Sequence, residues 1–458
     1  MSVTEEVLDR VDAAGVDLVR IVFVNNSGVP RGRVVDRDGL ASALEDGANV
    51  THAMQSFNAL DRLAPEGQYG PAGEVRVLPD PETFTVLPYD DRAGLLLADL
   101  YGLDGEPWAA GPPAQLRRYL DALAEEGYEP ATAFESEYYL TRETDGGDGD
   151  AGGVRPFDDS TCFSTDGMRS AHDVVLDTVD ALEAQGMGLA TYYPEYGPGQ
   201  QELVIEHGRG VTAPDDYVRF KETVRAVARD HGIGATFRPK PFPQLPGSGC
   251  HTHVSLWDTE TGENVFHDPD DGGRYPLGER GRHFVGGLLE HAPALLALTA
   301  PTVESYDRLA PGMWSSAYVC WGPDNREAAV RVPSVDDSDP EATTRVEFKP
   351  VDNTANPYLV QFGLLAAGMD GIERELDPGE PLDTDPGALD DEERAARGIE
   401  RFPTTLAEAV DALDADDALR EAMGDALVDS YVQVKRSEWN QSVDDEGEWE
   451  SEYLARGF

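Results

Sequence analysis

Basic residues are scarce in this chain, and lysine is the scarcest of them. Asp and Glu number 88 against 36 for Lys and Arg, which gives a formal net charge of −52 at pH 7. Lysine occurs only at Lys221, Lys240, Lys349 and Lys435. The acid is spread through every segment, which is typical of a halophilic surface, where concentrated salt screens the repulsion between carboxylates. So negative a chain predicts neither a nucleic-acid partner nor an anionic membrane partner.

Cysteines and long apolar runs are also few. Cys162, Cys250 and Cys320 are odd in number and far apart, which predicts reduced thiols in a cytoplasm. No apolar run is long enough to span a bilayer, and the acidic first residues lack the apolar core of a secretory signal. With 458 residues, 40% of them hydrophobic, the chain can bury a large core and is expected to form two domains.

Runs of β-branched and aromatic residues, and apolar residues at helical spacing, predict the main elements. A first unit, ending near residue 105, is expected to contain strands at 18–24, 31–35, 84–87 and 94–100 and a helix at 38–44. Beyond it we expect a strand at 131–140 and helices at 112–126, 170–184, 215–230, 281–298 (kinked at Pro293) and 406–437. The acidic, glycine-rich stretch 144–153 is expected to be a solvated loop.

A tight glycine turn followed by a strand occupies residues 247–255. Side chains two apart on a strand share a face, so His251, His253 and Ser255 are predicted to point the same way. Two imidazoles and a hydroxyl beside a glycine loop suit a metal ion or a phosphate. Taken alone, the pattern also fits ordinary surface or core histidines.

Five glutamates interrupt or flank apolar strands, where an unpaired charge would be costly to bury. They are Glu135, Glu137, Glu195, Glu202 and Glu347. Oxygen-rich ligation with one histidine suits Mg²⁺ or Mn²⁺ better than Zn²⁺. In so acidic a chain, each pair of glutamates alone also fits a solvated face.

Four arginines form the second chemical group: Arg308, Arg326, Arg331 and Arg345. Guanidinium groups bind phosphate and carboxylate in a bidentate manner, and neutralisation of nearby acid is the alternative role. Together with the glutamates and the glycine turn, the arginines indicate phosphoryl transfer, which depends on neutralising the charge of the moving group.

Six motifs in order resemble the glutamine synthetase superfamily from end to end. They lie at residues 134–139, 195–202, 247–255, 301–309, 321–326 with Arg331, and 345–347 followed by 355–359. The resemblance implies an α+β fold with an N-terminal β-grasp domain (1–105) and a catalytic domain (106–458) in which helices pack on an antiparallel sheet. It also implies a cytoplasmic enzyme that assembles as hexameric rings or dodecamers, in which a neighbour's N-terminal domain completes each site.

The resemblance further implies roles for individual residues. One metal ion would be held by Glu137, Glu195 and Glu202, and the other by Glu135, His251 and Glu347. ATP would be bound by His253, Ser255, Arg326, Arg331 and Arg345. Glutamate would be held by Gly247, Arg308 and Lys349. Catalysis would involve Arg308, Arg326 and Trp314. The implied cofactors are two or more Mg²⁺ or Mn²⁺ ions, with ATP as co-substrate. In the implied reaction, ATP phosphorylates glutamate to give γ-glutamyl phosphate and ADP. An amine or ammonia then attacks this intermediate to give an amide and phosphate.

The sequence departs from glutamine synthetases on the ammonia side. Residues 51–57 lack the aspartate that helps those enzymes bind ammonium, and Trp314 stands where their flap carries a glutamate. Pro246 and Lys349 replace an asparagine and an arginine. A pocket without the two acids and with an indole favours a larger, partly apolar amine, such as putrescine or another polyamine.

Two alternatives stay open. The chain is an ordinary glutamine synthetase if other residues, such as Asp61, replace the missing acids. It is a non-catalytic regulatory relative if it binds ATP and metal without turnover, although the complete set of metal ligands argues against this. The connector at 381–393 contains no tyrosine, so control by tyrosine adenylylation is not expected.

Overall fold

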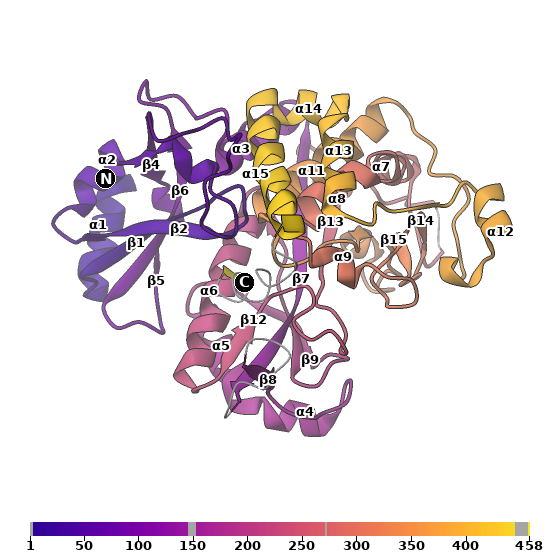
Figure 1. Cartoon of the computed structure of the whole chain (residues 1–458), viewed down its shortest axis with the longest axis horizontal. Coiled ribbons are helices and arrows are strands. Elements are labelled where there is room, and N and C mark those ends of the chain that lie inside the picture. Colours follow the sequence, from indigo (N-terminus) through magenta and orange to yellow (C-terminus); the bar gives the residue numbers. More distant parts are fainter. Residues whose placement is uncertain (1–2, 145–152, 271–272, 445–456) are drawn as a thin grey trace.

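The computed structural model describes residues 3–144, 153–270, 273–444 and 457–458, and two β-sheets organise them (Figure 1). The N-terminal sheet has six strands in the order β2-β1-β6-β4-β3, with β5 paired to β6. Its strands are β1 (Leu18–Val24), β2 (Pro30–Asp36), β3 (Ala48–Thr51), β4 (Glu74–Pro79), β5 (Thr85–Val86) and β6 (Ala93–Tyr101). Only β1 and β6 pair in parallel.

Two helices and two 3₁₀ turns accompany this sheet: α1 (Val3–Ala14), α2 (Leu40–Asp46), η1 (His52–Gln55) and η2 (Pro81–Thr83). Helix α1 buries Val7 and Val11 in a small cluster with Leu40 and Leu96. Figure 1 shows this unit on the left, beside the larger second part.

The larger sheet has eleven strands, and its main path runs β17-β14-β15-β16-β13-β7-β10-β9, with β8, β11 and β12 also paired to β7. The strands are β7 (Tyr128–Glu143), β8 (Val154–Pro156), β9 (Leu189–Pro194), β10 (Gln200–Ile205), β11 (Gly208–Arg209), β12 (Gly234–Thr236), β13 (Cys250–Asp258), β14 (Tyr318–Pro323), β15 (Ala328–Val332), β16 (Val346–Phe348) and β17 (Glu400–Arg401). All pairs are antiparallel except β14 with β15. The long strand β7 is therefore the centre of this sheet.

Helices pack around the larger sheet. They are α3 (Pro112–Glu125), α4 (Thr165–Ser170), α5 (His172–Glu183), α6 (Thr212–Asp230), α7 (Glu279–Glu290), α8 (Ala292–Thr299), α9 (Ser305–Arg308), α10 (Pro340–Thr343), α11 (Pro357–Glu373), η3 (Pro386–Ala388), α12 (Asp391–Ala396), α13 (Leu406–Asp414), α14 (Asp417–Met423) and α15 (Asp425–Asp444). Helix α11 is apolar on nearly every side and is buried, as expected for a helix enclosed by others. Asn356 caps it by accepting from the main-chain N–H groups of Tyr358 and Leu359.

Helix α15 joins the two parts through buried polar contacts. Asn26 Nδ2 donates to Ser430 Oγ (2.8 Å), and the main-chain N–H of Ala59 donates to Glu438 Oε1 (2.8 Å). Glu438 also pairs with Lys435 at 2.9 Å, and both side chains are almost completely buried. A buried charge is costly unless it is paired, and Glu438 is satisfied by Lys435 of α15 and by the main-chain N–H of Ala59. These contacts hold the N-terminal unit against helix α15.

The α+β fold class is confirmed, and most predicted strands and helices of both parts are present. The helix expected at 281–298 is two helices, because Pro293, which lacks an N–H, lies in the first turn of α8 instead of inside one helix. The helix expected at 406–437 is three helices: Asp416 caps the start of α14, and Gly424, with φ of 85°, ends it. Of the strand expected at 84–87 only Thr85 and Val86 pair. The stretch expected as a loop at 144–153 lies almost entirely outside the described residues.

Lysine is kept almost exclusively inside the molecule. Lys221, Lys349 and Lys435 are between 0% and 4% exposed, and Lys240 is half-buried. Cys162, Cys250 and Cys320 are free thiols. Across the part of the chain that the structure describes, no helix is both long enough and apolar enough to cross a membrane.

Candidate active site

Neighbouring strands of the larger sheet carry acidic and histidine side chains next to one another. In the pairing of β7 with β13, His251 lies opposite Glu135, and β10 places Glu202 opposite Glu137. On the other side of β13, Glu347 of β16 lies opposite His253. Opposite residues of antiparallel strands have adjacent side chains, so strand register brings these distant segments to one place.

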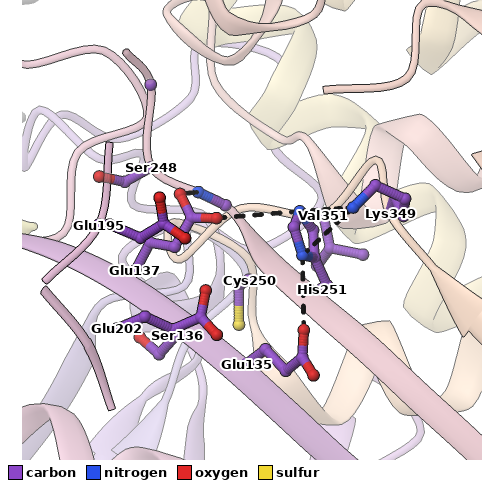
Figure 2. Close-up of polar contacts among 12 residues, drawn as sticks. Glu135, Ser136, Glu137, Glu195, Glu202, Ser248, Cys250, His251, Lys349 and Val351 are labelled. Atoms are coloured by element: carbon purple, nitrogen blue, oxygen red, sulfur yellow. Dashed lines mark hydrogen bonds and ion pairs between the residues drawn. The ribbon is translucent and has the colours of Figure 1, made fainter. Parts of the chain in front are cut away.

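Three carboxylates form the first cluster. Glu137, Glu195 and Glu202 each offer an oxygen within 4.8 Å of the others, and Figure 2 shows them gathered beside His251. Burial and the charge of Glu137 raise the pKa of Glu195 to about 7. Burial, then the charges of Glu137 and Glu135, raise the pKa of Glu202 well above its usual range. An all-oxygen set under mutual repulsion fits a hard divalent cation, which would relieve that repulsion.

The second cluster contains Glu135 and Glu347 with both histidines. Glu135, His253 and Glu347 offer ligand atoms within 4.8 Å of one another. His251 Nδ1 lies 3.6 Å from Glu135 Oε2 and 3.4 Å from Glu347 Oε1. The geometry therefore places either histidine near the two carboxylates, whereas the sequence prediction names His251 as the ligand.

Hydrogen bonding distinguishes the two histidines. Arg345 Nε donates to His253 Nδ1 at 3.1 Å, so the proton of a neutral His253 is on Nε2, which lies 2.8 Å from Glu135 Oε1. A protonated nitrogen has no lone pair for a metal. Burial and the nearby charge of Lys349 lower the pKa of His251, which keeps it neutral and able to ligate. The donor chemistry thus fits Glu135, His251 and Glu347 as the second metal-binding set.

Glu347 is held as a carboxylate although it is completely buried. Burial opposes its ionisation, but neighbouring positive charge, that of Lys349 above all, outweighs that effect and lowers its pKa to about 2. Arg331 Nη1 lies 2.8 Å from Glu347 Oε2, and Lys349 Nζ lies 3.3 Å from Oε1. Arg331, predicted to bind nucleotide, is thus engaged with this glutamate in the structure.

The glycine turn before β13 lets a buried arginine reach the site. A Cβ on Gly247 would lie 2.7 Å from Arg308 Cγ and 2.7 Å from the main-chain oxygen of Pro239, so a side chain at this position would clash. Arg308 is 4% exposed and donates from Nη1 to the main-chain oxygen of Val351 at 3.0 Å. The turn thus positions a guanidinium group at the cavity wall.

Three polar residues that the sequence did not single out support the carboxylates. Gln200 Nε2 donates to Glu137 Oε2 (3.1 Å), and the Tyr193 hydroxyl donates to Glu202. Asn353 Nδ2 donates to the main-chain oxygens of Glu137 (2.8 Å) and Gly249 (3.0 Å). Gln200 lies in the motif at 195–202 and Tyr193 lies just before it, so the sequence could have pointed to both. The role of Asn353 depends on contacts between distant segments.

Two cavities meet at Glu135. One, of about 680 Å³, is lined by the first carboxylate cluster and also by Gly247, His251, Arg308, Trp314, Arg326 and Lys349. The other, of about 620 Å³, is lined by His253, Ser255 and Arg345. Glu135 lines both. The residues predicted to hold glutamate thus line the first cavity, and three of the five predicted to bind ATP line the second. Of the other two, Arg326 lines the first cavity together with the glutamate-binding residues, and Arg331 is paired with Glu347.

Aromatic side chains surround the first cavity. The rings of Phe163 and Tyr193 are tilted by 32° with centroids 4.6 Å apart, and the ring centroid of Tyr196 lies 6.2 Å from that of Trp314. Phe163, Tyr196 and Trp314 are 58%, 63% and 59% exposed, so their rings are available to a ligand. Asp61, the alternative ammonium residue, pairs with Arg31 at 2.6 Å and is not among the described residues that line this cavity.

Known proteins resemble this chain over nearly its whole length. The family model described as the glutamine synthetase catalytic domain matches residues 109–454, and the model described as the glutamine synthetase N-terminal domain matches residues 3–108. A glutamine synthetase of Halobacterium salinarum is 34% identical, covering 99% of this chain and 96% of the relative. One from Pyrococcus abyssi is 34% identical, covering 93% and 91%.

Solved structures agree with these matches. A crystal structure of a novel glutamine synthase homolog superimposes with a TM-score of 0.83 at 32% identity, covering 97% of this chain and 99% of that chain. A complex of GmaS with ADP superimposes with a TM-score of 0.83 at 31% identity, covering 97% and 98%.

Proposed function

The chain belongs to the glutamine synthetase family, whose members are ATP-dependent ligases that form a C–N bond, and from this premise we propose that its acceptor is an organic amine, a polyamine such as putrescine. The family substrates are glutamate, ATP and either ammonia or an amine. The substrate that distinguishes members is therefore the acceptor, and the acceptor end of the site is where this chain is unusual.

The observation that carries the proposal is the aromatic rim of the first cavity. Trp314 and Tyr196 form exposed aromatic surface beside Glu137 and Glu195. Aromatic faces attract organic cations, so a protonated alkylamine would be favoured at this rim.

At the donor end, positive charge suits glutamate and its phosphorylated form. Arg308, Arg326 and Lys349 line the same cavity as the carboxylates, while Gly247 keeps the wall free of a side chain. Guanidinium groups bind carboxylate and phosphate oxygens through paired donors. We assign Arg308 and Lys349 to the substrate glutamate, and Arg326 to stabilising negative charge as the γ-carboxylate is activated.

Divalent ions, Mg²⁺ or Mn²⁺, would supply charge neutralisation for the transferred phosphoryl group. The residues that would hold them are Glu137, Glu195 and Glu202 for one ion and Glu135, His251 and Glu347 for the other. His253, Ser255 and Arg345 would contact the nucleotide in the second cavity. Arg345 orients His253, and Trp257 Nε1 donates to Ser255 Oγ at 3.0 Å, so both nucleotide-facing groups are already oriented by the chain.

The same premise supports the remaining proposals on organisation. We assign residues 1–105 to the N-terminal β-grasp domain and 106–458 to the catalytic domain, and we expect hexameric rings or dodecamers. Analytical ultracentrifugation of the purified protein tests the assembly, because a monomer and a hexamer differ sixfold in mass.

Ammonia is the second candidate acceptor. It is favoured by the names of the similar relatives from Halobacterium salinarum and Pyrococcus abyssi, which are both glutamine synthetases. A non-catalytic regulatory role is opposed by the two complete ligand sets. The test is phosphate release from ATP with Mn²⁺ and glutamate at high salt, comparing ammonium with mono- and diamines. Turnover with a diamine and little with ammonium supports the proposal; turnover with ammonium alone refutes it, and none with any amine favours the regulatory role.

A further inference from the structure

The loop that carries Trp314 has an unusual backbone. Gly312, Trp314 and Ser316 have φ values of 72°, 56° and 65°, so alternate residues of one short segment adopt the left-handed region. Residues other than glycine rarely adopt this region, and they keep it only where surrounding contacts impose it. The exposed side chains of Met313 and Trp314 bury too little surface to impose it.

A buried carboxylate from the next turn provides such a contact. Glu327 Oε1 accepts the main-chain N–H of Trp314 at 2.9 Å, and the Glu327 side chain is only 8% exposed. Close by, Ser316 Oγ donates to the main-chain oxygen of Ala328 at 2.7 Å. The two anchors of the loop are thus adjacent residues: Glu327 directly precedes β15, and Ala328 is the first residue of that strand.

The turn that carries Glu327 is itself fixed. The main-chain N–H of Glu327 donates to Asn325 Oδ1 at 3.0 Å, and Asn325 Nδ2 donates to the main-chain oxygens of Leu382 (2.8 Å) and Thr384 (3.0 Å). Between Asn325 and Glu327 stands Arg326, which lines the same cavity as Trp314. The turn that Asn325 fixes therefore carries Arg326, which we assign to the activated glutamate, and anchors Trp314, which we assign to the amine.

Electrostatics act on the Glu327 carboxylate in both directions. Burial and, to a smaller extent, the charge of Asp385 raise the pKa of Glu327, while its bond to the main-chain N–H of Trp314 and the charge of Lys349 favour the carboxylate. Hydrogen bonds to a charged acceptor in a buried place are among the stronger ones in proteins. The Glu327 side chain consequently ties the loop to the turn at Trp314.

We propose that Glu327 is a positioning residue for acceptor specificity: its carboxylate holds the Trp314 loop over the cavity, so that the indole forms part of the amine-binding surface. The proposal rests on the proposed function, because it concerns the same acceptor site. Trp314 contacts the acceptor, and Glu327 acts only through it.

The test compares Glu327→Ala, Glu327→Gln and the control Glu373→Ala, which removes an exposed carboxylate at the end of α11. Glu327→Ala is expected to raise the KM for the amine by about five- to tenfold, the scale of losing one ordinary hydrogen bond, while the KM values for ATP and glutamate change by less than about twofold. Glu327→Gln keeps an acceptor oxygen and should restore most of the wild-type KM. The control should behave as wild type.

A spectroscopic readout separates this proposal from the identity of the acceptor. The fluorescence of Trp314 is obtained as the difference between each protein and its Trp314→Phe counterpart, and its quenching by acrylamide should increase in Glu327→Ala and return toward wild type in Glu327→Gln. Unchanged quenching together with an unchanged KM for the acceptor overturns the proposal. If the wild-type enzyme accepts ammonia alone, the proposed acceptor is wrong, and Glu327 is still judged by the quenching. If Glu327→Ala does not fold, Glu327→Leu, which fills similar space without an acceptor atom, takes its place. The same rise in the KM for the amine and in quenching supports the role of the carboxylate, and values equal to wild type overturn it.

Discussion

Replacing Asn353 by alanine should weaken both the fold and one metal-binding set. The Asn353 side chain is completely buried, and its Nδ2 donates to the main-chain oxygens of Glu137 and Gly249. Its Oδ1 accepts from the hydroxyls of Ser136 (2.6 Å) and Tyr217 (2.5 Å). One amide thus ties β7 to the turn before β13 and to α6.

The magnitude follows from the number of groups left without partners. Asn353→Ala deprives two carbonyl oxygens and two hydroxyls of a buried partner, and each such loss costs about 1–3 kcal/mol. Because neighbouring losses do not add fully, we expect the free energy of unfolding to fall by about 3–5 kcal/mol, near the upper end for single substitutions. Ser136→Ala removes one of the four bonds and should cost about 1 kcal/mol.

Two assays on the same samples test this prediction. Denaturant titration at one fixed salt concentration gives the free energy of unfolding, and phosphate release as a function of Mn²⁺ gives the apparent metal affinity. Removing the support of a metal ligand typically costs about 10–100-fold in affinity, so the Mn²⁺ concentration for half-maximal activity should rise at least about tenfold in Asn353→Ala. The control is Asn49→Ala at an exposed strand position. If Asn353→Ala matches the control in both assays, the role assigned to this amide is refuted.

Four further predictions follow from the site and the helical core. Trp314→Ala should raise the KM for the amine about 3–30-fold, the range of a cation–π contact, and leave the KM for glutamate near wild type in steady-state assays. His251→Asn should abolish binding of one Mn²⁺ in calorimetry, whereas His253→Asn should retain both ions and weaken ATP; equal loss of metal in both variants would contradict the proton placement on His253. The pKa of Glu195 is raised to about 7 without metal, so Mn²⁺ binding should release protons below about pH 7 and tighten as pH rises through that value. Calorimetry in buffers of different ionisation enthalpy measures the proton release, and its absence would be evidence against this prediction. Burial opposes the charge of His291, but its hydrogen bonds to two aspartates outweigh burial and raise its pKa. The stabilisation that charged His291 contributes should therefore be complete below about pH 6.5 and disappear as pH rises through the folded pKa. The difference in unfolding free energy between wild type and His291→Gln should close at alkaline pH, and a difference independent of pH would refute this.

Elements whose apolar pattern is clear within a short segment were predictable from the sequence. Element boundaries that depend on tertiary packing were not. Strand β7 was visible because apolar residues alternate around Glu135 and Glu137. The break between α7 and α8 was not, because a proline fits either a kink or a first turn, and only packing selects between them. Helix α1 was missed because its buried face consists of little more than Val7 and Val11.

The same limit applies to the site. The sequence grouped the glutamates, the histidines and the arginines by type and motif, and the structure brings nearly all of them around two adjoining cavities. It could not show that Arg331 is engaged with Glu347, or that Arg345 fixes the proton of His253, because both facts depend on strand register. Neither could it show Glu327 beneath the Trp314 loop, since the bond joins a side chain to a main-chain N–H thirteen positions away.

The burial of lysine has a practical consequence for handling the molecule. Three of its four lysines are enclosed, so reagents that react with primary amines will modify the side chain of Lys240 far more readily than those of Lys221, Lys349 or Lys435. Coupling a dye or a solid support through lysine would therefore attach the chain at almost one point and in one orientation. Lysine-directed cross-linking would report little about how copies of this chain contact one another, and carboxylate-directed reagents are the better choice on so acidic a surface.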